Sequence, residues 1–179
     1  MTNINFIPFP NLLTERIVLR QLINEDEEEI LKLRSDNEVN KYLNRQPCKS
    51  IEDARVFIEI INNNIKNLQS VYWAITQNGN DRLIGTICLY DFTSDNTKAE
   101  IGYELLPEFQ GKGFMREALF MVLEYGFQTI GLTAIAAYTH PKNPRSTRLL
   151  ESFNFKEKSK VSENLIELEL HANLFASVL

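Results

Sequence analysis

The hydrophobic pattern changes its period once, near the middle of the chain. From Ala99 to Leu105, apolar and polar positions alternate, as in a strand whose two faces have different surroundings. Beyond Gly113, the apolar residues recur at helical spacing, at Met115, Ala118, Leu119, Val122, Leu123 and Phe127. The pattern therefore predicts a strand, a turn that contains Gly111 and Gly113, and an amphipathic helix.

Similar patterns predict the other elements. Strands are expected at Thr14–Leu22, Val71–Thr76, Arg82–Phe92, Leu132–Thr139, Lys156–Val161 and Leu165–Leu170. Helices are expected after Asn24, at Glu38–Leu43, from Ser50 towards Leu68, and at Arg145–Phe153. The order of these elements, in which no sequence repeat occurs, predicts a mixed α/β sheet.

Local signals indicate where several elements begin. Asn24 is a suitable helix N-cap, and the acidic run Glu25–Glu29 is expected to form a solvated first turn. Ser50–Asp53 resembles a capping box, in which the side chains of the cap and the third helical residue bond each other's backbone. Asn78–Asp81 has the residue types of a tight turn and predicts a β-hairpin.

Length and charge narrow the class of protein. The chain has 179 residues and a formal net charge of −5, and we expect one domain over residues 1–179. The negative charge disfavours binding to nucleic acid, whereas it suits a cationic substrate such as an amine. No apolar run approaches the roughly 20 residues needed to span a membrane. With no signal peptide evident and only Cys48 and Cys88 as thiols, a cytoplasmic protein with reduced cysteines is expected.

The glycine turn before the central helix is a candidate anion site. Such a turn leaves backbone N–H groups unpaired at the positive end of the helix dipole, where they suit phosphate. Two familiar nucleotide loops do not fit, because Lys112 is followed by Gly113 instead of Ser or Thr, and Arg116 stands where a dinucleotide loop has its third glycine. On spacing alone, a tight helix-entry turn without a ligand explains the glycines equally well.

Two polar residues follow the strand predicted at Leu132–Thr139. Asn143 and Ser146 have the spacing of a helix cap and its first turn. The same amide and hydroxyl could instead bond a ligand at the mouth of the strand. The sequence leaves both interpretations open.

Two carboxylates share one face of the central strand. Glu100 and Glu104 are separated on that face only by Gly102, so either could act as a general base beside an open groove. Solvent-facing positions would explain them as well. His140 and His171 are isolated in the sequence, and no metal site is expected.

The order of these motifs resembles the GNAT superfamily of acetyl-CoA-dependent N-acetyltransferases. Within it, the chain is similar to the ribosomal-protein alanine acetyltransferase (RimJ/RimL-type) branch. The matching segments are the opening strand Leu13–Arg20, the strand Ala99–Tyr103, the turn Pro107–Gly113 followed by Glu117 and Ala118, and the pair Asn143 and Ser146. The resemblance implies a mostly antiparallel central sheet that splays apart at its middle, with helices on both faces.

The resemblance also implies where acetyl-CoA binds and how it reacts. The residues implied for the cofactor are Leu105, Leu106, Gln110, Gly111, Lys112, Gly113, Phe114, Met115, Asn143 and Ser146. Its pantetheine arm would pair with the backbone at Leu105 and Leu106, and its pyrophosphate would lie on the N–H groups of Gly111–Met115. Glu100 would be the base that deprotonates the amine, unless a water chain serves, and Ser146 the acid that protonates the departing thiolate.

The chain departs from the family pattern at three positions. Met115 replaces a small residue, so its side chain must point into the core for the backbone to approach phosphate. Asn154 replaces a glycine, which is acceptable because asparagine enters the left-handed conformation more readily than most residues. Leu150 stands where many relatives have a tyrosine acid, which leaves Ser146 as the candidate acid.

The sequence thus predicts an enzyme that moves an acetyl group directly from acetyl-CoA to a primary amine, without a metal. The acceptor would be a protein N-terminus or a small amine, in a pocket walled by the helices before Leu68 and by the loop Asp91–Asn96. The protein would act as a monomer or homodimer. A non-catalytic domain that binds acetyl-CoA is the alternative.

Overall fold

The computed structural model describes residues 4–175, which contain one eight-stranded sheet. Its strands are β1 (Leu12–Leu13), β2 (Ile17–Gln21), β3 (Ser70–Gln77), β4 (Asn80–Tyr90), β5 (Lys98–Leu105), β6 (Ala134–Thr139), β7 (Lys156–Ser162) and β8 (Leu165–His171). They lie in the order β1-β2-β3-β4-β5-β6-β8-β7, and every neighbouring pair is antiparallel except β5 and β6. The predicted mixed, mostly antiparallel sheet is confirmed.

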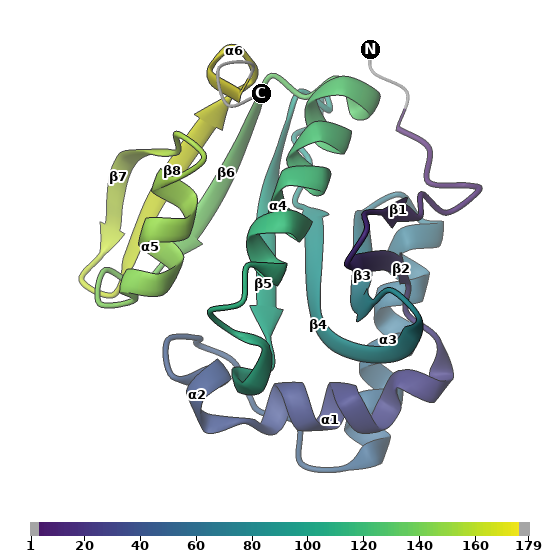
Figure 1. Cartoon of the computed structure of the whole chain (residues 1–179). Helices are drawn as coiled ribbons and strands as arrows, with labels where there is room; N and C mark the ends of the chain where they lie inside the picture. Colours follow the sequence, from purple (N-terminus) through teal and green to yellow (C-terminus); the bar gives the residue numbers. More distant parts are fainter. Residues whose placement is uncertain (1–3, 176–179) are drawn as a thin grey trace.

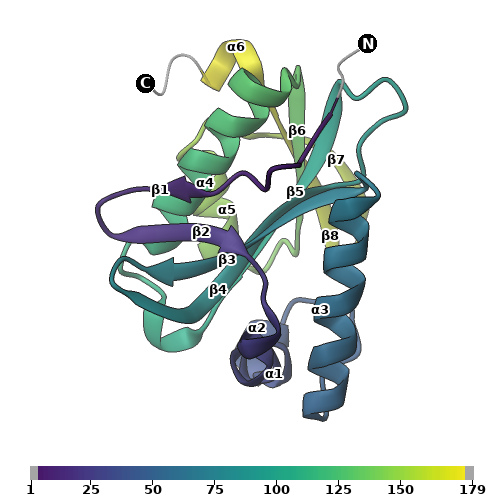
Figure 2. The same cartoon turned by 90° about the vertical axis from the view of Figure 1, so that its right-hand side faces the viewer.

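Helices cover both faces of this sheet. Their bounds are α1 (Glu27–Ser35), α2 (Asn37–Asn40), α3 (Ile51–Lys66), α4 (Phe114–Glu124), α5 (Pro144–Glu151) and α6 (Ala172–Phe175). Figures 1 and 2 show α4 and α5 on one face of the sheet and α3 on the other, with α1 and α2 at one end. Short 3₁₀ turns precede α1 (Asn24–Asp26) and α4 (Pro107–Phe109), and a π-helical turn (Tyr125–Ile130) extends α4.

The stripe of apolar residues on α4 was predicted correctly. Ala118, Leu119, Val122 and Leu123 are fully buried, and their side chains form part of the main core. Met115, which stands where the family pattern has a small residue, is half-buried and packs against this core, as expected. Burying such a stripe stabilises the fold by roughly 25 cal/mol for each Å² of apolar surface removed from water.

The sheet opens between its two parallel strands. β5 pairs with β6 only from Lys98 to Ile101, whereas on its other side it stays paired with β4 as far as Leu105. Gly102–Leu105 therefore have no partner on β6, and Figure 1 shows the two strands diverging towards the end where α1 lies. We call this opening the wedge. It confirms the splayed sheet that the resemblance implied.

The N-terminal elements differ from the prediction. Of the expected strand Thr14–Leu22, Ile17–Gln21 form β2. β2 pairs with β1, which precedes the predicted strand, and a bond from the Thr14 N–H to the Ile17 carbonyl closes the turn between them. Asn24 does not cap a helix, because the 3₁₀ turn begins there and the Ile23 N–H instead donates to the Asp26 carboxylate. Asp26 is buried and pairs with Arg20 at 2.7 Å, so the acidic run is not wholly solvated.

Other boundaries shift by a few residues. The helix predicted at Glu38–Leu43 begins one residue earlier, because the Asp36 side chain caps its start. It ends at Asn40, three residues before the predicted end. β6 begins at Ala134, since the Leu132 N–H still bonds the Gly126 carbonyl at the end of the helix. α6 was not predicted, and its sequence carries no cap signal. The Ser50 capping box is confirmed on α3.

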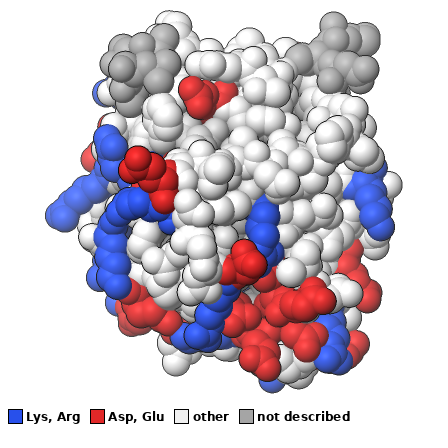
Figure 3. Space-filling view, turned by 45° about the vertical axis from the view of Figure 1, so that its right-hand side comes forward, with Lys and Arg blue, Asp and Glu red and all other residues white. Residues whose placement is uncertain are grey.

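Charged residues are unevenly distributed over the surface. Figure 3 shows acidic side chains gathered low on the molecule, at the end where α1 lies in Figure 1. Glu27, Glu28 and Glu29 form the first turn of α1, where a helix dipole favours negative charge. Within residues 4–175, no helix is both long and apolar enough to cross a membrane. Residues 1–3 and 176–179 of the expected single domain lie outside the described part, and the single domain stays a prediction.

Candidate active site

The glycine turn between β5 and α4 has the backbone geometry of an anion site. Gly111 and Gly113 both have positive φ values, 74° and 85°, which L side chains rarely adopt. Gly113 is the N-cap of α4. As a glycine it has no side chain that could bond the free N–H groups of the first turn. Phe114 and Met115 therefore present N–H groups at the positive end of the helix dipole.

A cluster behind the turn holds it in place. The Arg16 guanidinium donates to the Lys112 carbonyl at 3.2 Å and pairs with Glu117 of α4 at 2.6 Å. The Thr14 hydroxyl also donates to Glu117. Because Arg16 neutralises Glu117, the acidic residue in the first turn does not oppose an anion at the N–H groups.

The backbone of β5 is directed into the wedge at two residues. The Leu106 N–H donates to the Ile84 carbonyl of β4 at 2.9 Å, and its carbonyl accepts from the Phe109 N–H. Because residues along an antiparallel pair bond their neighbour alternately, Tyr103 and Leu105 turn their N–H and C=O groups away from β4, towards the wedge. The fold thus already uses both backbone groups of Leu106.

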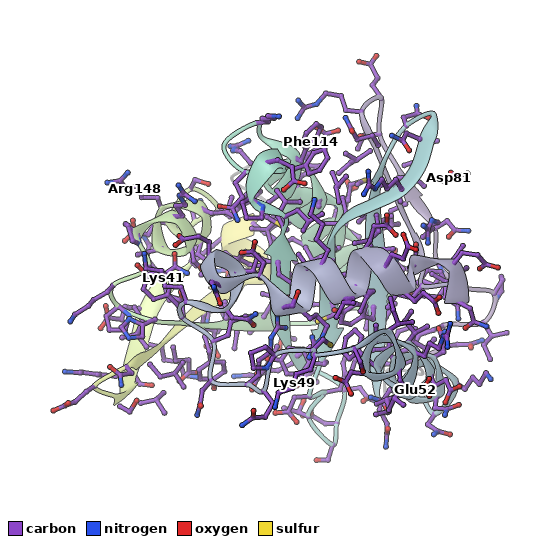
Figure 4. All side chains as sticks on the ribbon, turned by 90° about the horizontal axis from the view of Figure 1, so that it is seen from below. Lys41, Lys49, Glu52, Asp81, Phe114 and Arg148 are labelled. Atoms are coloured by element: carbon purple, nitrogen blue, oxygen red, sulfur yellow. The ribbon has the colours of Figure 1, made fainter. Side chains whose placement is uncertain are left out.

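The mouth of the wedge is bridged by Gln110. Its side-chain amide donates to the Leu105 carbonyl at 2.9 Å, and its carbonyl accepts from Arg145 at the start of α5 at 2.5 Å. Figure 4 looks into this end of the molecule, where Phe114 of α4 and Arg148 of α5 lie on one side of α1, and Lys49 and Glu52 on the other. The turn and α5 thus face each other across the wedge.

Asn143 and Ser146 combine the two roles that the sequence left open. The Asn143 side chain accepts from the Ser146 N–H at 3.3 Å and caps α5. The Ser146 hydroxyl lies 2.9 Å from the hydroxyl of Tyr103 on β5, so it faces the wedge. Burial raises the pKa of Tyr103 to about 12, and its phenol remains protonated at neutral pH.

The two candidate carboxylates have different surroundings. Glu104 is only 10% exposed and pairs with Arg45 at 2.6 Å and with Arg34 at 3.5 Å. Glu100 is half-buried, and burial, opposed by a hydrogen bond from Tyr90, raises its pKa. A carboxylate held in place by two guanidinium groups is not free to turn towards an amine, so Glu100 is the better candidate for a base.

The segment 41–49 crosses the wedge on the face that carries these carboxylates. Arg45 ties it to Glu104 of β5, and the ring of Tyr42 lies 5.3 Å from that of His140, just beyond β6. His140 therefore packs at the wedge, whereas His171 pairs with Glu169 on β8. Sequence reasoning missed Tyr42 and Arg45, because no local signal links them to residues about 60 to 100 positions away.

A pocket of about 840 Å³ lies on the same face, where the sequence led us to expect the acceptor site. The end of α3 (Ile61 to Leu68), the start of β3, the end of β4 and the loop Asp91–Asn96 line it. Cys88 of β4 lies opposite Gly102, where an added Cβ would be 3.4 Å from its sulfur. Burial raises the pKa of the Cys88 thiol to about 12, so it is not a nucleophile.

The rest of the described chain offers few other sites. A hollow of about 460 Å³ lies between β1 and the end of α4, far from every residue predicted to act. Among residues 4–175, His, Cys, Asp and Glu nowhere form a group of three that could hold a metal ion. The chemistry-bearing groups gather instead at the wedge and on the Glu100 face.

The opened parallel strand pair beside a glycine-bounded helix start agrees with the splayed sheet and anion site that the family resemblance implied. Residues 16–156 match the model of the acetyltransferase (GNAT) domain, and the chain belongs to this family. It is therefore an acetyltransferase that uses acetyl-CoA and acts on an amine.

Two proteins are similar to this chain in sequence, and a solved structure is similar in fold. The chain is 33% identical to the uncharacterized N-acetyltransferase YoaA of Bacillus subtilis, over 89% of this chain and 90% of that protein. It is 36% identical to the uncharacterized N-acetyltransferase p20 of Bacillus licheniformis, over 82% and 83%. The crystal structure of spermidine N-acetyltransferase from Vibrio cholerae, in complex with CoA and spermine, has a TM-score of 0.80 over 91% of this chain and 99% of that one. At 22% sequence identity, this likeness shows the shared fold.

Proposed function

We propose that acetyl-CoA binds in the wedge and that an amine receives its acetyl group there by direct transfer. The observation that carries the proposal is the end of the β5–β6 pairing at Ile101, close to the free N–H groups at the start of α4. The backbone of Tyr103 and Leu105 would pair with the pantetheine arm, and the N–H groups of Gly111–Met115 would bind the pyrophosphate. Leu106 would take no direct part, because its backbone groups have partners and its side chain is buried in the core.

The chain's own residues then move two protons. A protonated amine has no lone pair, so Glu100 would take one proton from it, directly or through water, before the nitrogen attacks the acetyl carbon. The N–C bond forms and the C–S bond breaks, and Ser146 would donate a proton to the departing thiolate. Glu100 points to one face of β5 and Ser146 contacts Tyr103, which points to the other, so the two groups would approach the thioester from opposite sides.

The finer identity of the protein belongs to the same proposal. The order of motifs supports the RimJ/RimL-type branch, and the two free cysteines support a cytoplasmic location. A single domain over residues 1–179, as a monomer or homodimer, fits a chain of this length. A non-catalytic domain that binds acetyl-CoA is the second candidate, supported by the clamped Glu104 and the absence of a tyrosine at Leu150.

An amine acetylation assay with two variants tests this function. Release of the CoA thiol would be followed with a panel of amines, and acetyl-CoA binding measured by calorimetry. Glu100→Gln and Ser146→Ala should each lower kcat about 100-fold, the size of a lost general base or acid, with little change in the Kd of acetyl-CoA. Because the pKa of Glu100 is raised, wild-type kcat should rise with pH through that pKa, and Glu100→Gln should lose this dependence.

One result would contradict the proposed acetyl transfer. Acetyl-CoA binding without turnover of any amine, unaffected by either variant, would support the non-catalytic domain. Asp81→Asn, an exposed change on the β3–β4 hairpin far from the wedge, is the matched control and should leave both measurements unchanged.

A further inference from the structure

The 840 Å³ pocket is joined to the proposed base by two of its own residues. Tyr90 lines the pocket and lies directly opposite Glu100 in the β4–β5 pair, and Asp91, the next residue, also lines the pocket. On the adjacent strand, Gly102 has no side chain to cover Tyr90 or Cys88, which would lie 3.3 and 3.4 Å from an added Cβ. The pocket is therefore lined by the two β4 residues, Cys88 and Tyr90, that pair with Gly102 and Glu100 of β5.

A buried hydroxyl in this pocket lacks a partner within the described chain. Ser70, the first residue of β3, is 5% exposed, and its Oγ has no hydrogen-bond partner among residues 4–175. An unsatisfied buried hydroxyl is energetically costly, so such groups usually meet a polar atom of a ligand or water. Because Ser70 also lines the pocket, its hydroxyl is available to a polar group held there.

The charge of the lining is one-sided. Among residues 4–175, Asp91 is the only charged side chain that lines the pocket, and Glu100, opposite Tyr90, adds a second carboxylate beside it. Within the same described residues, no Lys or Arg lines this pocket to pair with a carboxylate on a ligand. Because Asp91 follows Tyr90, the cross-strand partner of Glu100, both carboxylates would face the same ammonium group. A ligand with one ammonium group is thus favoured, whereas a further ammonium elsewhere in the pocket would meet no carboxylate of the lining.

Aromatic rings form much of the remaining wall. Tyr72, Tyr90 and Phe92 line the pocket, and the Tyr72 hydroxyl is already bonded to Thr86 at 2.9 Å. Tyr72 consequently offers its ring to a ligand, and such rings pack well against a flat apolar or aromatic body.

We propose that this pocket is the acceptor site and that it selects a small monoamine with an uncharged, aromatic or hydroxylated body. The proposal rests on the proposed acetyl transfer and gives its substrate class. Asp91 holds the ammonium near Glu100, the rings hold the body, and Ser70 bonds a polar atom at its far end. Amino acids, whose carboxylate would face Asp91 and Glu100, and polyamines are poor acceptors.

The test uses the full chain, acetyl-CoA and matched acceptors. Tyramine and tyrosine differ only in a carboxylate, tyramine and phenethylamine only in a hydroxyl, and spermidine and a short peptide represent the other classes. We expect kcat/KM for tyramine to exceed that for tyrosine and for spermidine at least about tenfold, the scale of an unpaired charge at a binding site.

Two conservative variants connect this preference to the pocket. Asp91→Asn should raise the KM for tyramine about tenfold and leave the Kd of acetyl-CoA unchanged. Ser70→Ala should reduce the preference for tyramine over phenethylamine, and Asp81→Asn serves as the control. The thermal midpoint of each variant is measured with and without tyramine. A midpoint close to that of the wild type shows that the variant is folded.

Two further outcomes separate the proposals. Preferred turnover of tyrosine, spermidine or the peptide, unchanged by Asp91→Asn, would overturn the substrate class while acetyl transfer itself stands. If no acceptor is acetylated although acetyl-CoA binds, the proposed function fails, and this inference fails with it.

Discussion

At the scale of single residues, Tyr103 gives Ser146 a defined orientation. Its phenol has a pKa raised to about 12 by burial, so it is a permanent hydrogen-bond donor at neutral pH. If Tyr103 donates to the Ser146 oxygen 2.9 Å away, the hydrogen of Ser146 is left to point elsewhere in the wedge. Tyr103 is then a positioning residue for the proposed acid.

The Tyr103→Phe variant tests this role. Loss of the phenol should lower kcat about tenfold and leave the KM for acetyl-CoA unchanged, because the ring still packs while Ser146 loses its orientation. A double-mutant cycle with Ser146→Ala is the decisive measurement. The two effects on kcat should not add, because each variant by itself already removes the contact between the Tyr103 and Ser146 hydroxyls. Additive losses, or an unchanged kcat in Tyr103→Phe, would contradict the assignment.

At the scale of elements, the segments around the wedge tie β5 to its neighbours. Gln110 joins the Leu105 carbonyl to α5, and Arg45 and Arg34 join segments near α1 to Glu104. Breaking a buried ion pair on one side leaves an uncompensated charge, so these ties are stronger than surface pairs. These contacts join the walls of the wedge to neighbouring elements, and the Gln110 bridge lies across its mouth.

Removing the Gln110 side chain should change the affinity for acetyl-CoA, and the direction of that change distinguishes two roles for this residue. The sequence places it among the residues that bind the cofactor, whereas its amide bonds the Leu105 carbonyl with which the pantetheine arm would pair. If the side chain competes with the arm, Gln110→Ala should tighten acetyl-CoA binding about threefold, the net value of one hydrogen bond. Calorimetry measures this Kd. Weaker binding would show that Gln110 acts as a ligand instead.

At the scale of the whole molecule, ion pairs make stability depend on pH. Hydrogen bonds from Arg55, Lys32 and Lys158 lower the pKa values of Glu27, Glu108 and Glu167. A carboxyl whose pKa is lower in the folded state stabilises the protein above its unfolded pKa, and this stabilisation is lost as the pH falls through the folded value. Glu100, whose pKa is raised, acts in the opposite direction.

We therefore expect thermal midpoints to be nearly constant from about pH 7 to pH 5 and to fall below about pH 4, where these carboxyls bind protons. In Lys158→Met, Glu167 loses its main partner, so the acid decline should be shallower. Differential scanning calorimetry across this range measures both. Equal midpoints at pH 7 and pH 3.5 would refute the prediction.

The sequence by itself determined the elements and the glycine turn. Alternation gave β5, helical spacing gave α4, and the caps of α3 and α5 were visible as Ser50 and Asn143, because these signals depend on neighbours within a few residues. The left-handed Asn154, with a φ of 66°, was expected on the same local grounds. The candidate cofactor residues followed from a family resemblance carried by the same motifs.

Only the tertiary structure decided how distant side chains share the site. Arg45 reaches Glu104 across 59 positions and Tyr103 reaches Ser146 across 43, and no periodicity encodes such pairs. The tertiary structure also showed that the N–H and carbonyl of Leu106 are already hydrogen-bonded, to β4 and to Phe109. The bond to β4 depends on the register of the two strands. The pocket with its unpartnered Ser70 depends on how α3 packs over β3 and β4. Packing, unlike local propensity, is a property of the whole chain.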